Sequence, residues 1–213
     1  MTFSCKMIGF WFVLVTAMNL ELTPAVLAAP ATPIEAQTIA DHFSSIKSMS
    51  GDFVQSGPKS EKTSGKFFLQ RPGKIRFNYA GQSGISVIAD GKSLVVYNKK
   101  LKTSRLYALS KTPLKLLIDN NVDFSGKRFK GITEEGSLWS VRLADKTAFG
   151  SAKIDMMFDR KSLDLRKWIL TDERGQTTTI TISNVKEGVR IAEGTFKIDY
   201  AANRENNTNS KSR

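Results

Sequence analysis

The 213-residue sequence contains one cysteine, Cys5, and one histidine, His42. This scarcity excludes the usual cysteine and histidine zinc sites and the cysteine–histidine nucleophile systems. No Gly-x-Ser-x-Gly elbow is present that could use His42 in a serine triad. Gly84 and the Gly91–Ser93 segment resemble a phosphate loop, but six residues separate the glycines, where that motif has four. We therefore expect no enzyme activity, no catalytic residue, no metal and no other cofactor.

The sequence also lacks an apolar run of the roughly twenty residues that span a bilayer. Its longest run extends from Met7 to Met18 and directly follows Lys6. A basic residue, a short apolar run and small residues ending at Ala28 are typical of a secretory signal peptide. Cys5 precedes the run, so it is misplaced for lipidation. We expect residues 1–28 to be cleaved after Ala28, leaving a soluble, unlipidated protein.

Acidic residues are scarce, with 20 Asp and Glu against 32 Lys and Arg, and the net charge is +12. The basic residues are scattered rather than clustered on one helix or loop, and an exported protein seldom meets nucleic acid, so we expect no nucleic-acid partner. Acidic protein partners and anionic lipid headgroups fit the charge better. A generally basic, soluble surface is an equally good interpretation.

A helix is predicted after Thr32-Pro33-Ile34-Glu35, which combines a threonine cap, a proline at the first helical position and a glutamate at the third. Ile39, Phe43 and Ile46 then recur at spacings of four and three, so one apolar stripe must pack on something larger. His42 lies beside this stripe, where a packing role is the simplest interpretation.

From Met49 onward the apolar period changes to two, which indicates strands with one dry face and one wet face. Asp90-Gly91 predicts a hairpin between residues 85–89 and 93–98. We expect about eleven antiparallel strands, which form a barrel, a sandwich or one strongly curved sheet. The alternating residues are Met49, Gly51 and Phe53; Phe67 and Leu69; Ile75, Phe77 and Tyr79; Trp139, Val141 and Leu143; Ile154, Met156 and Phe158; Trp168 and Leu170; Thr178, Ile180 and Ile182; and Phe196, Ile198 and Tyr200.

A second, apolar helix is predicted where Thr112-Pro113 leads into residues 114–119. An open, curved sheet has a concave face that such a helix can fill, whereas a closed barrel has little use for it. An ordinary crossover helix packed on a sandwich is the alternative. The predicted organisation is a signal peptide at 1–28, a single domain at 29–202 and a disordered polar tail at 203–213.

Several short motifs, in this order behind a signal peptide, resemble the periplasmic outer-membrane lipoprotein carrier proteins, the LolA family. Each motif is weak alone, but the resemblance runs through nearly all of the predicted mature chain. The matching segments are Met49–Gln55, Gly65–Leu69, Arg71–Lys74, Asp90–Leu94 with Tyr97-Asn98, Thr112–Leu114 and Asp172–Thr177.

The resemblance implies a mostly β fold: an incomplete antiparallel β-barrel of about eleven strands, with an α-helical lid over an apolar concave face. It implies a monomeric periplasmic chaperone that carries triacylated lipoproteins from the inner to the outer membrane. An inner-membrane lipoprotein-releasing ABC transporter would load it, and an outer-membrane receptor or the outer membrane would unload it. The alternative is a periplasmic lipid- or lipoprotein-sensing binding module of the same fold.

The resemblance also implies functional residues. Arg71 would latch the lid by hydrogen-bonding to backbone carbonyls, a role suited to a guanidinium with five donors in a fixed fork. From the residues alone, a solvated arginine at a strand end is the simpler interpretation. The expected acyl-chain cavity residues are Leu69, Ile75, Phe77, Val87, Leu94, Val96, Met156, Phe158 and Ile180, and the expected lid residues are Leu114, Leu117 and Ile118.

Overall fold

The computed structural model describes residues 33–81, 84–147 and 150–203. The predicted signal peptide, with its cleavage site, and residues 204–213 of the predicted tail lie outside this part of the chain. The elements in chain order are α1 (Pro33–Ser45), β1 (Ser48–Ser56), β2 (Lys62–Gln70), β3 (Lys74–Tyr79), β4 (Ile85–Asp90), β5 (Ser93–Asn98), β6 (Thr103–Ala108), η2 (Leu109–Lys111), α2 (Lys115–Ile118), β7 (Phe129–Glu135), β8 (Leu138–Thr147), β9 (Gly150–Asp159), β10 (Leu165–Thr171) and β11 (Thr177–Glu187).

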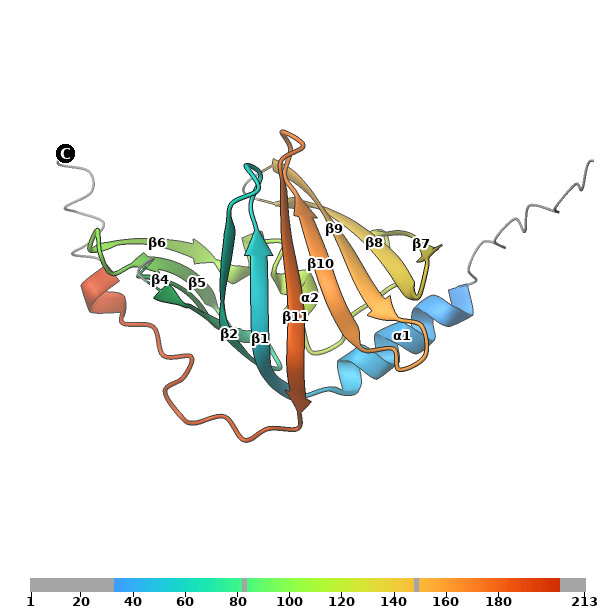
Figure 1. The fold of residues 1–213 in the computed structure, drawn as a ribbon, viewed down its shortest axis with the longest axis horizontal. Coiled ribbons are helices and arrows are strands. Elements are labelled where there is room, and N and C mark those ends of the chain that lie inside the picture. The colour runs from blue at the N-terminus through green and yellow to red at the C-terminus, as the bar shows by residue number, and fades with distance from the viewer. Residues whose placement is uncertain (1–32, 82–83, 148–149, 204–213) are drawn as a thin grey trace, which may run out of the picture.

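The strands form one antiparallel sheet of eleven strands in the order β6-β5-β4-β3-β2-β1-β11-β10-β9-β8-β7. The pairing of β1 with β11 joins the two halves, and β6 and β7 are the two edges. The sheet curves strongly but does not close (Figure 1). The predicted fold class, an incomplete antiparallel barrel, is confirmed.

The concave face carries the apolar side chains, as the period of two predicts. In β3, Ile75 and Phe77 are buried, whereas Lys74 and Arg76 alternate with them on the convex face. The expected hairpin of β4 and β5 is present. Asp90 ends β4, Gly91 and Lys92 form the turn, and the Asp90 carboxylate accepts from the backbone amides of Lys92 and Ser93. One dry face therefore runs around the inside of the curve.

Helix α1 packs on this face with its predicted stripe. Ile39 and Phe43 are almost fully buried, and the ring of Phe43 meets that of Phe158 on β9 edge-on, with centroids 5.4 Å apart. The ring of Phe124 also packs on that of Phe158, with centroids 5.9 Å apart. Figure 1 shows α1 beside β9 and β10, so this helix covers one half of the concave face.

Helix α2 is shorter than predicted and has only one turn. The hydroxyl of Thr112 does not cap it but donates to the carbonyl oxygen of Leu109 in the preceding turn, η2, at 2.9 Å. The apolar character still has the predicted effect, because Leu117 and Ile118 are buried. Burial against the sheet, rather than helical length, holds this segment in place.

The C-terminal segment corrects two predictions. Residues 196–199 form no strand; they follow the convex face, where Phe196 and Ile198 are buried. An extended segment on a surface also alternates its side chains, so the period of two is not specific to strands. Residues 200–203 form a helical turn, and Asn203, assigned to the polar tail, is buried.

Among the helices that the structure describes, none has the length and apolar character of a membrane-spanning helix.

Candidate functional site

An apolar cavity of about 340 Å³ lies between the concave face and the segment that contains η2 and α2. Its walls come from both halves of the sheet, so the two sides of the curve face each other across it. The lining residues are Gln55, Phe77, Tyr79, Val87, Leu94, Tyr107, Thr112, Pro113, Leu114, Leu117, Ala152, Ile154, Trp168, Leu170, Asp172, Thr178 and Ile180.

The structure places half of the residues expected in the cavity or its lid on the cavity wall. These are Phe77, Val87, Leu94 and Ile180 from the sheet, with Leu114 and Leu117 from the lid segment. They are contributed by β3, β4, β5 and β11 and by the segment around α2. The structure thus brings together residues that lie as far apart in sequence as Phe77 and Ile180.

The other expected residues lie elsewhere. Leu69, Ile75, Met156, Phe158 and Ile118 are at most 2% exposed and belong to the solid core. Val96 is 36% exposed on β5 and does not line the cavity. For Met156 and Phe158 on β9 the physical reason is that the rings of Phe43 and Phe124 pack on Phe158, so inward-facing residues there contact protein rather than open space.

The prediction missed several wall residues. Trp168 and Leu170 of β10 belong to an alternating pattern that pointed to a buried face, so a signal for them was present. Tyr107 lies on β6, a strand that the sequence pattern did not predict. Pro113 was interpreted only as a helix-start signal, yet it lines the cavity.

Polar groups gather at the end of the sheet where β1, β3 and β10 finish. The hydroxyl of Tyr79 donates to the Oε1 atom of Gln55 at 2.6 Å, and burial raises the pKa of Tyr79 to about 12. Asp172, at the end of β10, accepts from the backbone amides of Arg174 and Gln176. This polar rim defines one end of an otherwise apolar wall.

Arg71, at the turn between β2 and β3, is 6% exposed and donates to four backbone carbonyls. Its Nε atom donates to Ile46 at 3.1 Å, and its Nη2 atom donates to Phe43 at 3.3 Å. The Nη1 atom donates to Leu117 at 3.0 Å and to Asp119 at 2.5 Å. The guanidinium therefore joins the end of α1 and the residue just beyond it to the end of α2.

Burial lowers the pKa of Arg71 to about 10, and the nearby Asp119 carboxylate partly opposes this effect. A pKa near 10 still leaves the guanidinium charged at neutral pH. Charge-assisted hydrogen bonds are stronger than neutral ones, so four of them compensate for the removal of this cation from water. The arrangement has the geometry of a latch; whether it acts as one stays a prediction.

His42 contributes little to this site. Its Nε2 atom lies 3.4 Å from Oδ1 of Asp164, at a partly exposed position in the turn between β9 and β10. Within the described ranges, no group of three or more histidine, cysteine, aspartate and glutamate residues could hold a metal ion. The chemistry available in the cavity is the burial of apolar ligands.

Comparisons with known proteins point the same way. The model of the family "Outer membrane lipoprotein carrier protein LolA" matches residues 44–199. An outer-membrane lipoprotein carrier protein of Chromobacterium violaceum is 29% identical over 187 residues, covering 82% of this chain and 90% of that protein. A protein of the same name from Methylococcus capsulatus is 26% identical over 189 residues, covering 82% of this chain and 88% of its own length.

Two solved structures are similar at lower identity. A LolA superfamily protein from Nitrosomonas europaea is 12% identical with a TM-score of 0.43, covering 78% of this chain and 98% of that chain. A chain from the MucA/MucB complex of Pseudomonas aeruginosa is 16% identical with a TM-score of 0.43, covering 77% of this chain and 61% of that chain.

Proposed function

Because the chain belongs to the LolA family of outer membrane lipoprotein carrier proteins, we propose that it binds the acyl chains of lipoproteins in its apolar cavity and carries them across the periplasm. The observation that carries this proposal is the cavity itself, whose walls are mostly apolar, with polar residues at the rim formed by Gln55, Tyr79, Asp172 and Thr178 and at Thr112 of the lid segment. The protein is a binding and transport protein, and no chemical step is needed for this role.

The physical need for a carrier follows from the size of the cargo. At about 0.8 kcal/mol per methylene, exposing three acyl chains of about sixteen carbons to water costs on the order of 40 kcal/mol. Spontaneous release into the periplasm is therefore negligible. The chains have to pass from one apolar environment directly to the next, and a cavity on a water-soluble protein provides the intermediate one.

The size of the cavity implies movement of the lid. About 340 Å³ is at the small end of the roughly 300–1,000 Å³ of sites that hold one drug-sized molecule. Three acyl chains are larger than one such molecule, so the lid segment around Leu114 and Leu117 has to move away when cargo enters. Arg71 holds this segment closed over the empty cavity, which keeps a large apolar surface away from water.

The proposal extends to processing and partners. Residues 1–28 are removed on export, residues 29–202 form the carrier domain, and residues 203–213 are a polar extension whose first residue docks on the domain. The carrier works as a monomer in the periplasm. It receives triacylated lipoproteins from an inner-membrane lipoprotein-releasing ABC transporter and delivers them to an outer-membrane receptor or to the outer membrane.

Mass spectrometry of the material that co-purifies with the protein from the periplasm of its own host tests this function. The purified complexes are then mixed with outer membranes, and transfer is followed. Bound triacylated lipoproteins that move to the membranes support the carrier function. Free lipid alone, or lipoprotein that stays bound, would instead favour a sensing or binding module of the same fold.

A further inference from the structure

All the charged side chains between Asp90 and Asp119 are basic. This segment contains seven Lys and Arg residues and no Asp or Glu, so it carries a charge of +7 out of the +12 of the whole chain. It forms β5, β6, η2 and α2, which flank the cavity. The seven basic residues are Lys92, Lys99, Lys100, Lys102, Arg105, Lys111 and Lys115.

The charge is densest at the turn that joins β5 to β6, whose sequence is Lys99-Lys100-Leu101-Lys102; we call this segment the basic tip. All four residues are exposed, and Leu101 is 68% exposed. Among the described residues, only Ile34 is a more exposed large apolar residue, at 77%. The three lysines make no ion pair with any described residue, unlike Lys66 and Lys115, which pair with neighbouring carboxylates.

The basic tip is held in a defined turn. The Oδ1 atom of Asn98 accepts a hydrogen bond from the amide of Leu101 at 3.1 Å. The amide of Lys99 donates to the carbonyl of Gly84 at 2.8 Å, which ties the tip to the start of β4. Lys102 closes the turn with a φ of +48°, in the left-handed region. The backbone therefore presents Leu101 to solvent rather than folding it back on the sheet.

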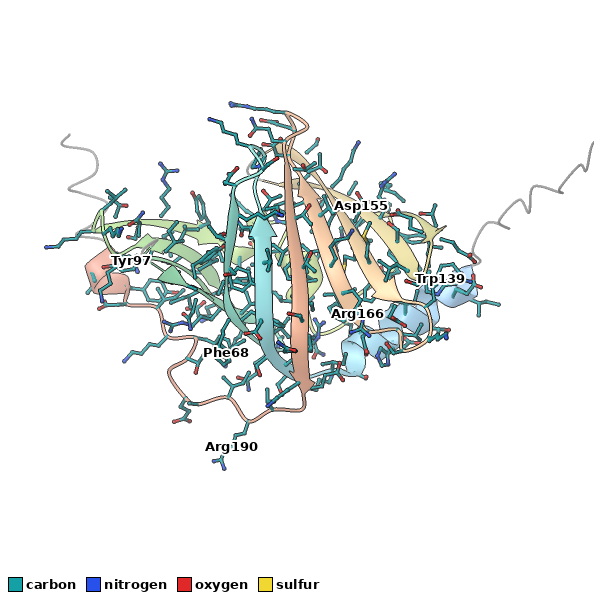
Figure 2. All side chains as sticks on the ribbon, in the orientation of Figure 1. Phe68, Tyr97, Trp139, Asp155, Arg166 and Arg190 are labelled. Atoms are coloured by element: carbon teal, nitrogen blue, oxygen red, sulfur yellow. The ribbon has the colours of Figure 1, made fainter. Side chains whose placement is uncertain are left out.

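The basic tip lies at the same end of the antiparallel sheet as the polar rim of the cavity. Strands β1, β3 and β5 run in one direction, so Gln55, Tyr79 and Asn98 all lie near strand ends on that side. Arg71 lies at the other end of the strands. Figure 1 shows β5 and β6 extending away from α1, and Figure 2 places Tyr97 at that far side of the molecule. In the strand order the basic tip and the polar rim therefore share one end of the sheet.

We propose that the basic tip docks on an anionic lipid bilayer, with the three lysines among the headgroup phosphates and Leu101 in the acyl layer. One apolar side chain flanked by lysines suits an interface of this kind. Lysine acts as a point charge without the fork of arginine, so it matches a fluid layer of phosphates better than a fixed carboxylate on a protein. A contact this small is weak and reversible, as a carrier that must leave the membrane requires.

The purpose of docking rests on the proposed function, but the docking itself does not, because vesicle binding by the empty protein does not involve cargo. The test is co-sedimentation of the mature chain with vesicles of phosphatidylcholine, alone or mixed with phosphatidylglycerol, over a range of salt concentrations. We expect binding only to the anionic vesicles, weakening as salt rises. Replacing Lys99, Lys100 and Lys102 together by Gln lowers partitioning on the order of 100-fold, from about 1 kcal/mol per lysine. Leu101→Ser lowers it about tenfold.

Matched controls separate position from charge. Lys130 on β7, Lys153 on β9 and Lys127 in the turn before β7 are exposed in the other half of the molecule, and their joint replacement by Gln removes the same charge. Ile34→Ser on α1 matches the loss of an exposed apolar residue. Both controls keep most of the binding if the proposal holds. Equal losses in the tip and control variants, or no binding to anionic vesicles, would overturn it. Loss of delivery without any loss of vesicle binding would instead assign the tip to a protein partner.

Discussion

The guanidinium of Arg71 lies over the ring of Phe43, with its central carbon 4.4 Å from the ring centroid. The same side chain donates to the backbone carbonyl of Phe43 and to carbonyls at the end of α2. One residue from the turn between β2 and β3 thus holds both helical segments that cover the concave face. The ring of Phe43 also packs on Phe158 of β9, so Phe43 belongs both to the Arg71 contact and to the aromatic core.

Replacing Arg71 with Leu tests the latch. The variant loses four hydrogen bonds while keeping a side chain that fits an apolar site, so we expect it to fold and to leave α2 unfastened. Amide hydrogen exchange in residues 115–119 should accelerate, because their protection depends on closure. Cargo should be accepted but not passed on efficiently to acceptor membranes.

Arg71→Lys is the matched control, since it keeps the charge but cannot reach carbonyls on both segments at once. We expect intermediate exchange in residues 115–119. Normal delivery of cargo by Arg71→Leu would contradict the latch role, whatever its exchange rates.

Val87→Glu tests the cavity wall. Val87 lines the cavity from β4, and a carboxylate there would be desolvated by bound acyl chains, so binding should fall by at least tenfold. Binding of a fluorescent fatty acid reports the loss. Val54→Glu is the control, because Val54 is 43% exposed on β1 outside the cavity and the substitution is identical. Equal affinity of the two variants would show that the acyl chains bind elsewhere.

Ionisation of Tyr79 gives a pH prediction. Its pKa is raised from 10.0 to about 12 by burial, so the folded state keeps a proton that the unfolded state loses first. The contribution to stability is complete below about pH 10 and is lost as pH rises towards about 12. Ultraviolet difference spectroscopy should show a tyrosinate component with a midpoint near 12 that is missing in Tyr79→Phe. The stability difference between the two proteins should narrow over the same interval.

Phe43→Ala tests the packing of α1. Phe43 is fully buried, and its ring packs edge-on against that of Phe158, so truncation leaves a cavity and should lower the free energy of unfolding by about 3–5 kcal/mol. Urea denaturation followed by circular dichroism measures the change. Ile34→Ala, on the same helix at a residue 77% exposed, should change it by less than about 0.5 kcal/mol.

The architecture could be predicted from the sequence because apolar and polar residues alternate along most strands. The apolar residues of β3 and β9 predicted which face is dry, and Asp90-Gly91 predicted the hairpin. Strands β6 and β7 were missed. They are the two edge strands, each paired with only one neighbour, and their sequences TSRLYA and FKGITEE show no sustained alternation of apolar and polar residues.

The cavity was harder to predict because alternation cannot show what covers an inward-facing residue. Ile75 and Phe77 are neighbours on the same face of β3, yet Ile75 is fully buried in the core and Phe77 lines the cavity. A charge at Ile75 would therefore damage folding rather than test acyl binding, and Val87 is the better position. The boundary between core and cavity depends on which segments pack over each strand, which is a tertiary property.

The two open edges of the sheet affect how far its interior can widen. Strands β6 and β7 end the strand order, and no ladder joins them. A closed barrel can expand only by breaking backbone hydrogen bonds, at about 0.5–1.5 kcal/mol each. This open sheet can instead widen when its two edge strands move apart, and every pairing between neighbouring strands stays intact. Its interior can then widen for acyl chains of different bulk without the loss of a backbone hydrogen bond.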